Sequence, residues 1–216
     1  MVAMEKRAAG GPVSLLHSAL NAYDAPFMSS QAERNPSVHE KVQLMSASEI
    51  ERTLVRLAHE IIEKSNGSTD LGLVGIRRRG VPLAERLAKT IERIEKRPVP
   101  IGILDITLYR DDLSTLGPKP LVQKGDIGFP VTGKTIILVD DVLYTGRTVR
   151  AAMDALFREG RPKQVRLCVL IDRGHRELPI EASFVGRAVQ TTAREIIEVR
   201  LKEIDRKDQV MLMEKE

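Results

Sequence analysis

Short apolar segments alternate with amphipathic segments between residues 48 and 171, and this order constrains the possible folds more than any other feature. The predicted strands are four short, mainly apolar segments at residues 71–76, 101–109, 135–139 and 165–171. Apolar residues recur every three or four positions within residues 50–62, 83–94 and 149–156, which predicts three helices, whereas residues 110–133 are expected to be an irregular region rich in Gly and Pro. Strands that alternate with helices form a mostly parallel central sheet with helices on both faces, an α/β fold. Binding sites of such sheets lie at the carboxyl ends of the strands.

Capping and turn residues mark the ends of the predicted helices. Ser48 and Glu51 have the spacing of a capping box, and Asn66-Gly67 offers a left-handed stop to the first helix. Pro82 is expected to open the second helix, because proline is favoured in a first turn. The third helix is expected to end at Gly160.

The first 45 of the 216 residues differ from the rest of the chain. They mix Gly and Pro with Ser, Asn and Gln and show no sustained period, which predicts a largely disordered extension over 1–45 and one domain over 46–216. No apolar run approaches the roughly 18 residues of a membrane span, so we expect no membrane protein. The single cysteine, Cys168, excludes an intramolecular disulfide and favours a cytoplasmic protein.

Residues 128–135 match the Walker A pattern of P-loop NTPases letter for letter. That motif binds phosphate because it follows a strand and opens a helix. Here Lys134 and Thr135 lead directly into a β-branched run, and Pro130 removes a backbone donor from the loop. We therefore interpret the segment as a turn before a strand.

Two adjacent carboxylates, Asp140 and Asp141, follow the apolar residues 136–139, and the turn at residues 145–148 then leads into a helix. Amides of that turn and the positive end of the helix can hold a phosphate monoester. The carboxylates lie where they could bind a vicinal diol and a magnesium ion on it. A phosphorylated ribose fits both halves; the alternative is a strand and an N-capped helix without a ligand.

Residues 139–150 resemble the loop that binds phosphoribosyl pyrophosphate (PRPP) in type I phosphoribosyltransferases. Together with residues 105–113 and 172–180, they closely resemble the PyrR family of bifunctional pyrimidine operon regulators and uracil phosphoribosyltransferases. The resemblance covers about residues 45–216. It implies the type I phosphoribosyltransferase fold and a reaction of uracil with PRPP and Mg²⁺ that gives UMP and pyrophosphate. The shared PRPP loop leaves open a phosphoribosyltransferase for another base.

The same resemblance implies roles for the residues of this loop. Asp140 and Asp141 would be catalytic, because they would face the ribose hydroxyls, the developing positive charge and the Mg²⁺ ion. The residues that bind PRPP and UMP would be Arg78, Asp140, Asp141, Val142, Leu143, Tyr144, Thr145, Gly146, Arg147 and Thr148.

A run of three arginines after the strand at 71–76 resembles the pyrophosphate loop of the family. Arg77 and Arg79, with Arg78 between them, and turn amides would offset the charge of the leaving pyrophosphate, and Arg79 would count as catalytic. The alternative is a solvated charged turn.

A hood and a base site complete the implied active site. The hood would begin at Tyr109 and Arg110, with residues 111–133 as a flap. Arg173 and backbone groups near Ile197 would contact uracil. We give the nearby His175 no catalytic role, because no nucleophile or metal-ligand pattern surrounds it.

The resemblance implies a second function, the binding of a pyrimidine operon leader RNA in a way that UMP or UTP controls. With 3% aromatic residues, the chain would bind a folded hairpin through phosphate contacts, on a homodimer or higher oligomer. The candidates are Arg52, Arg56, His59, Lys64, Arg77, Arg176 and Arg187. Val55 and Glu181 stand where the family pattern has threonine and arginine. The alternatives are an ordinary solvated surface and a protein that is only an enzyme.

Overall fold

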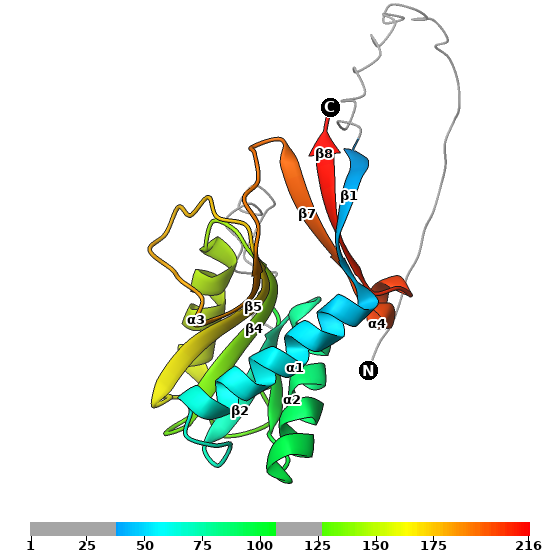
Figure 1. Cartoon of the computed structure of the whole chain (residues 1–216). Coiled ribbons are helices and arrows are strands. Elements are labelled where there is room, and N and C mark those ends of the chain that lie inside the picture. Colours follow the sequence, from blue (N-terminus) through cyan, green and yellow to red (C-terminus); the bar gives the residue numbers. More distant parts are fainter. Residues whose placement is uncertain (1–37, 107–126) are drawn as a thin grey trace, which may run out of the picture. The chain divides into compact units, whose positions relative to one another are not determined.

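A computed structural model describes residues 38–106 and 127–216 of the chain. Residues 1–37 of the expected extension lie outside the described residues, as do Tyr109, Arg110 and residues 111–126 of the expected flap. Within the described residues the chain forms two sheets and four helices (Figure 1).

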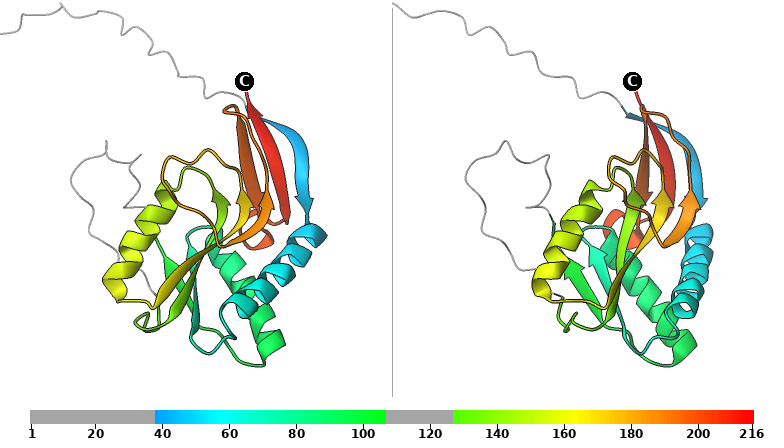
Figure 2. Two further views of the ribbon diagram at one scale, coloured as in Figure 1. Left: turned by 60° about the vertical axis from the view of Figure 1, so that its left-hand side comes forward. Right: turned by 90° about the vertical axis from the view of Figure 1, so that its left-hand side faces the viewer.

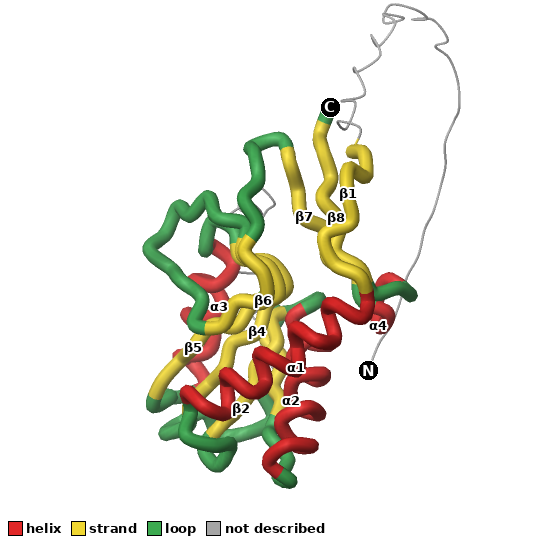
Figure 3. Tube along the Cα trace, in the orientation of Figure 1, coloured by secondary structure: helices red, strands yellow, loops and turns green. Residues whose placement is uncertain are grey.

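The larger sheet is parallel, with the strand order β3-β2-β4-β5-β6. Figure 3 labels four of its strands, β2, β4, β5 and β6. Its strands are β2 (Leu71–Ile76), β3 (Ile101–Leu104), β4 (Thr135–Leu143), β5 (Gln164–Asp172) and β6 (Phe184–Ala188). Successive strand residues point to opposite faces. Accordingly, Ile137 and Val139 of β4 join one hydrophobic core, and Ile136 and Leu138 join the other. The continuous apolar run thus marks a strand that is buried on both faces.

Helices cover both faces of this sheet, as the two views of Figure 2 show. α1 (Ala47–Lys64) and α2 (Gly80–Glu95) pack on one face, and α3 (Arg147–Glu159) packs on the other. The predicted α/β class is therefore confirmed. None of the helices in the described ranges is long and apolar enough to cross a membrane.

The smaller sheet is antiparallel and joins the two ends of the described chain. Its order is β1-β8-β7, with β1 (Val38–Ser46), β7 (Glu195–Arg200) and β8 (Gln209–Lys215). A short helix, α4 (Lys202–Asp205), precedes β8. Sequence reasoning predicted none of these strands, and the expectation of disorder is wrong for residues 38–45. Those residues are mostly exposed, so they show no apolar period, and they are ordered by pairing with β8 instead.

Several elements have other bounds than predicted. The strand predicted at residues 101–109 ends at Leu104, and Asp105 and Ile106 lie outside it. The first helix is capped by Ser46, whose backbone N–H donates to Glu49 Oε2 at 2.8 Å, and not by the pair Ser48 and Glu51. α2 begins at Gly80, two residues before Pro82. Its predecessor α1 ends where expected, with Asn66 and Gly67 at φ angles of 55° and 95°.

The segment that follows the expected flap is part of the fold. Ile127 and Val131 are 4% and 1% exposed and belong to the core on the α3 face. A Cβ atom on Gly102 would lie 2.8 Å from Ile127 Cγ2, so the glycine permits this packing. The flap prediction is therefore wrong for residues 127–133, because the side chains of Ile127 and Val131 are buried in this core. Thr135 begins the strand β4 and not a helix, which confirms that residues 128–135 are not a P-loop.

Candidate functional site

The carboxyl ends of three parallel strands bring most of the predicted site residues to one edge of the large sheet. Arg77–Arg79 follow β2, Asp140 and Asp141 lie near the end of β4, and Arg173 follows β5. The carboxylates belong to β4 itself, because that strand continues to Leu143 rather than ending at Val139. The pattern of an α/β binding site is thus present.

The two aspartates are held by backbone amides. Asp140 is 6% exposed, and its Oδ1 accepts a hydrogen bond from the Asp141 N–H at 2.9 Å. Asp141 Oδ1 accepts one from the Val142 N–H at 3.0 Å. Burial raises the pKa of Asp141, although its hydrogen bond with Asp140 and the charge of Arg79 oppose the shift. A ligand cation or developing positive charge would favour the ionised form of this pair.

The loop between β4 and α3, which is predicted to bind a phosphate, leads directly into the N-terminus of a helix. Gly146 adopts a φ of 92° at the N-cap of α3, a conformation that favours glycine. The N–H of Arg147 donates to Thr145 Oγ1 at 3.3 Å. The first turn of a helix leaves amides without intrahelical partners, and these amides and the helix dipole attract anions.

The other residues predicted to bind PRPP lie around this loop with different exposures. Leu143 is 1% exposed and is part of the core, so it can offer only backbone groups to a ligand. Val142 is half-buried against the opposite core. Tyr144 is 42% exposed, and Arg147 Nε pairs with Glu177 Oε2 at 2.7 Å. Thr148 is half-buried in the first turn of α3.

Arg173 connects the loop region to the smaller sheet. Its Nη2 donates to the Glu195 carbonyl at 2.8 Å, and its Nε donates to Thr191 Oγ1 at 3.2 Å. The guanidinium carbon lies 4.1 Å from the centre of the Tyr144 ring, and burial lowers the pKa of the side chain, which is part of a residue that is 6% exposed. Glu195 begins β7, in which Ile197 is buried. The two residues predicted for the base are therefore joined through the start of β7.

The three arginines after β2 have different partners. Arg79 donates to Asp205 of α4 through Nε at 3.2 Å and Nη2 at 2.9 Å. Arg77 Nη1 lies 3.1 Å from Asp105 Oδ2. Arg78 is exposed, and the peptide bond between Arg77 and Arg78 is cis. An exposed cation beside two anchored ones is a suitable arrangement for a polyanion.

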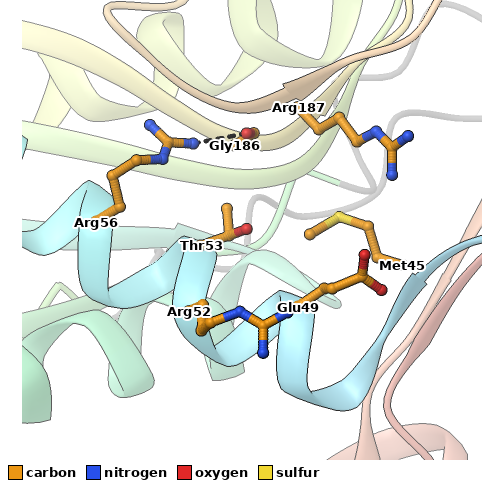
Figure 4. A pocket seen from close by; sticks show the side chains of 7 residues that line it. All are labelled: Met45, Glu49, Arg52, Thr53, Arg56, Gly186 and Arg187. Carbon is orange, nitrogen blue, oxygen red and sulfur yellow. Dashed lines mark hydrogen bonds between the residues drawn. The ribbon is translucent and has the colours of Figure 1, made fainter.

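The RNA candidates do not all line one pocket. A pocket of about 310 Å³ lies between α1 and β6 and is lined by three of them, Arg52, Arg56 and Arg187 (Figure 4). Arg56 Nη2 donates to the carbonyls of Gly186 at 2.6 Å and Val185 at 3.1 Å, and Arg187 donates to the Leu44 carbonyl. The pocket is lined by Met45, Glu49, Arg52, Thr53, Arg56, Gly186 and Arg187.

The remaining candidates do not line this pocket. His59 is exposed on α1, and Lys64 Nζ donates to the Ser183 carbonyl at 3.3 Å. Arg77 and Arg176 do not line the pocket. Val55, which departs from the family pattern, lines a separate groove between α1 and α2 and so removes nothing from the pocket.

Several partners in the site were missed by sequence reasoning. Asp205, Glu195 and Thr191 lie far along the chain from the arginines that they contact. No local pattern marks them, because their role depends on how the smaller sheet is placed. Glu177 stands next to a predicted RNA candidate, and its proximity to Arg147 becomes visible only in the folded chain.

The sequence model of the family described as the phosphoribosyl transferase domain matches residues 43–204 of this chain. The bifunctional protein PyrR of Pelotomaculum thermopropionicum is 60% identical over 175 residues, which cover 81% of this chain and 97% of that protein. The bifunctional protein PyrR of Thermus aquaticus is 56% identical over 176 residues, which cover 82% of this chain and 97% of that protein.

Solved structures show the same fold at lower identity. The hypoxanthine-guanine phosphoribosyltransferase of Bacillus anthracis superposes with a TM-score of 0.61 at 21% identity, covering 80% of this chain and 98% of that one. The hypoxanthine phosphoribosyltransferase of Trypanosoma cruzi gives a TM-score of 0.63 at 16% identity, covering 82% and 98%. At these identities the likeness shows the fold alone.

Proposed function

The chain belongs to the phosphoribosyl transferase family, and within it to the bifunctional PyrR proteins, so we propose that it is a uracil phosphoribosyltransferase and a regulator of the pyrimidine operon. The enzyme converts uracil and PRPP into UMP and pyrophosphate. One observation supports the enzyme most strongly: an aspartate pair in β4, of which Asp140 is buried and Asp141 half-buried, stands before a glycine loop with a positive φ that opens α3. This arrangement offers carboxylates to a ribose and amides to its 5′-phosphate.

The reaction replaces pyrophosphate by uracil at the anomeric carbon and passes through a transition state with oxocarbenium character. Catalysis then depends on the orientation of the two substrates and on electrostatic stabilisation. Asp140 and Asp141 are held by the amides of the next residues in β4, so little reorganisation is needed when positive charge develops on the ribose. Arg79 is anchored to Asp205, while exposed Arg78 is available to the leaving pyrophosphate.

Magnesium fits the donor set to a limited extent. Both side chains are carboxylates, and hard oxygen ligands suit Mg²⁺. The described residues contain no cluster of three or more potential ligands. Asp140 and Asp141 would therefore hold an ion that PRPP oxygens and water also coordinate, and the ion would offset the charge of the pyrophosphate.

Uracil would lie between the ends of β5 and β7. Arg173 is fixed to the Glu195 carbonyl and stacks on Tyr144, so it holds the start of β7 close to the PRPP loop. In our proposal Arg173 and the backbone near Ile197 provide the polar groups that select the base.

The regulatory function uses the pocket between α1 and β6. Three arginines and a threonine surround this space, and two of the arginines are already oriented by backbone carbonyls (Figure 4). Oriented guanidinium groups suit phosphates and base edges of RNA. We propose that leader RNA of a pyrimidine operon binds this surface in the cytoplasm, under the control of UMP or UTP, on a homodimer or higher oligomer.

A panel of bases tests the enzymatic proposal. Purified protein with PRPP and Mg²⁺ should form UMP from uracil and no nucleotide from orotate, hypoxanthine or adenine. Preference for another base would keep the phosphoribosyltransferase and refute uracil as its substrate. No nucleotide with any of the four bases would refute the enzyme.

A further inference from the structure

The side chain of Arg176, a predicted RNA candidate, contacts four acceptors beside the loop between β4 and α3. Its Nη1 donates to the carbonyls of Tyr144 at 2.9 Å and Gly174 at 3.1 Å, and its Nε donates to that of Ile180 at 3.0 Å. Its Nη2 lies 2.5 Å from Asp172 Oδ2, and the side chain is 23% exposed. A guanidinium that already serves four acceptors has little capacity left for an external phosphate.

The next residues of the same segment hold the next carbonyl of the loop. The N–H groups of Glu177 and Leu178 both donate to the Thr145 carbonyl, at 3.0 and 3.1 Å. A Cβ atom on Gly146 would lie 3.3 Å from Ile180 Cδ1, so side chains of this segment also pack against the loop. Residues 173–180, called here the clamp segment, therefore contact three consecutive residues of the loop.

The direction of these hydrogen bonds has a geometric consequence for the loop amides. In a trans peptide the C=O of one residue and the N–H of the next point in opposite directions. The peptides after Tyr144 and Thr145 are trans. Because both carbonyls point at the clamp segment, the N–H groups of Thr145 and Gly146 point away from it. A phosphate site needs such neighbouring N–H groups directed to one side.

We propose that Arg176 is a positioning residue for the 5′-phosphate of PRPP and UMP, because it fixes the Tyr144 carbonyl and thereby the direction of the loop amides. The inference rests on the proposed function and assigns a role that neither the phosphate loop nor the RNA surface requires. The charge of Arg176 is balanced by Asp172, so its effect on the phosphate passes through the backbone and not through direct attraction.

The test compares ligands with and without a 5′-phosphate on the full chain. Arg176→Ala should raise the KM for PRPP about tenfold, the size expected when a charged hydrogen bond is lost. The kcat and the KM for uracil should stay within about twofold, because the ribose and base contacts remain. By calorimetry, UMP should bind more weakly by a similar factor while the affinity for uridine stays constant.

A matched control is Arg166→Ala. Arg166 also donates to a backbone carbonyl, that of Lys64 at 2.9 Å, but near the opposite end of β5. This variant should leave the KM for PRPP and both binding affinities unchanged, even if its melting temperature falls.

The outcomes separate this inference from the proposed function. Wild-type protein that neither makes nor binds UMP would refute the proposed function itself. With an active wild type, an unchanged KM for PRPP in Arg176→Ala, or equal weakening of UMP and uridine, would overturn the positioning role. If Arg176→Ala does not fold, Arg176→Lys decides by the same comparison, because an ammonium group cannot reproduce the planar fork that serves four acceptors.

Discussion

The carboxylate of Asp205 accepts two hydrogen bonds from the Arg79 guanidinium, at 2.9 and 3.2 Å, and so ties α4 to the arginine loop after β2. Asp205 Oδ2 also accepts the Leu201 N–H at 2.9 Å, which fixes the carboxylate at the start of α4. The orientation of Arg79, which we propose contacts pyrophosphate, therefore depends on a residue of α4 that lies 126 positions further along the chain.

Replacement of Asp205 should consequently affect the enzyme without touching its substrate. We expect Asp205→Asn to lower kcat/KM for PRPP about tenfold, because Arg79 loses a bidentate, charge-assisted partner. Steady-state kinetics would measure the change. Glu203→Gln is the matched control on the same helix, since Glu203 pairs with Arg86 instead. Equal losses in both variants would mean that α4 acts only as a structural element.

Asp141→Asn should separate activity from stability. Activity should fall by at least about 100-fold, as when a group that stabilises transition-state charge is removed. Because burial raises the pKa of Asp141, its ionised form costs folding free energy at neutral pH, and the neutral amide removes that cost. The melting temperature at pH 7 should therefore stay the same or rise. A marked decrease, measured by calorimetry, would contradict the proposed environment of the carboxyl.

The acid stability of the smaller sheet should depend on Glu195. Hydrogen bonds from Lys41 and the Thr192 N–H lower the pKa of Glu195 from 4.5 to about 2. A carboxylate with a lowered pKa stabilises the fold above its unfolded pKa, and this contribution is lost as the pH falls from about 4.5 towards 2.

Thermal unfolding between pH 6 and pH 2.5 would measure this effect. The melting temperature of Glu195→Gln should depend less on pH than that of the wild type. Glu214→Gln serves as a control, because Glu214 faces the same lysine at 3.5 Å and is about half exposed. The same pH dependence in wild type and Glu195→Gln would exclude Glu195 as the relevant group.

RNA binding is best tested with Arg52, which lines the pocket between α1 and β6 without belonging to the proposed phosphate site. Arg52→Ala should weaken binding to the pyrimidine leader RNA and reduce the slope of log affinity against log salt by about 1. UMP formation should not change. Lys89→Ala is the control, because Lys89 lines the other groove, on the far side of α1 from the pocket. RNA binding that does not depend on UMP, on the RNA sequence or on Arg52 would refute the regulatory function and leave only the enzymatic one.

The part of the fold that sequence could predict is the part encoded locally. β2 occupies the predicted residues, and the β4-loop-α3 unit was recognisable because apolar run, carboxylates and glycine follow one another. The cap of α1 was ambiguous, since Ser46 and Ser48 both stand three residues before a glutamate. β1 could not be found, because its residues gain order from β8 at the other end of the chain.

The site shows the same division. Asp140, Asp141 and the phosphate loop follow from local pattern, whereas the partners of Arg79 and Arg173 come from α4 and β7. Arg176 was predicted as an RNA candidate from its charge, whereas its four intramolecular acceptors become visible only in the folded chain.

The pairing of β1 with β8 also bears on how the protein behaves when it is shortened. β8 lies between β1 and β7, and its Met211 and Met213 are 7% and 8% exposed. A fragment that began at Met45 would lose most of β1 and leave β8 with a free row of amides and carbonyls. Such an unprotected edge recruits strands from other molecules, so this fragment would be prone to self-association and aggregation.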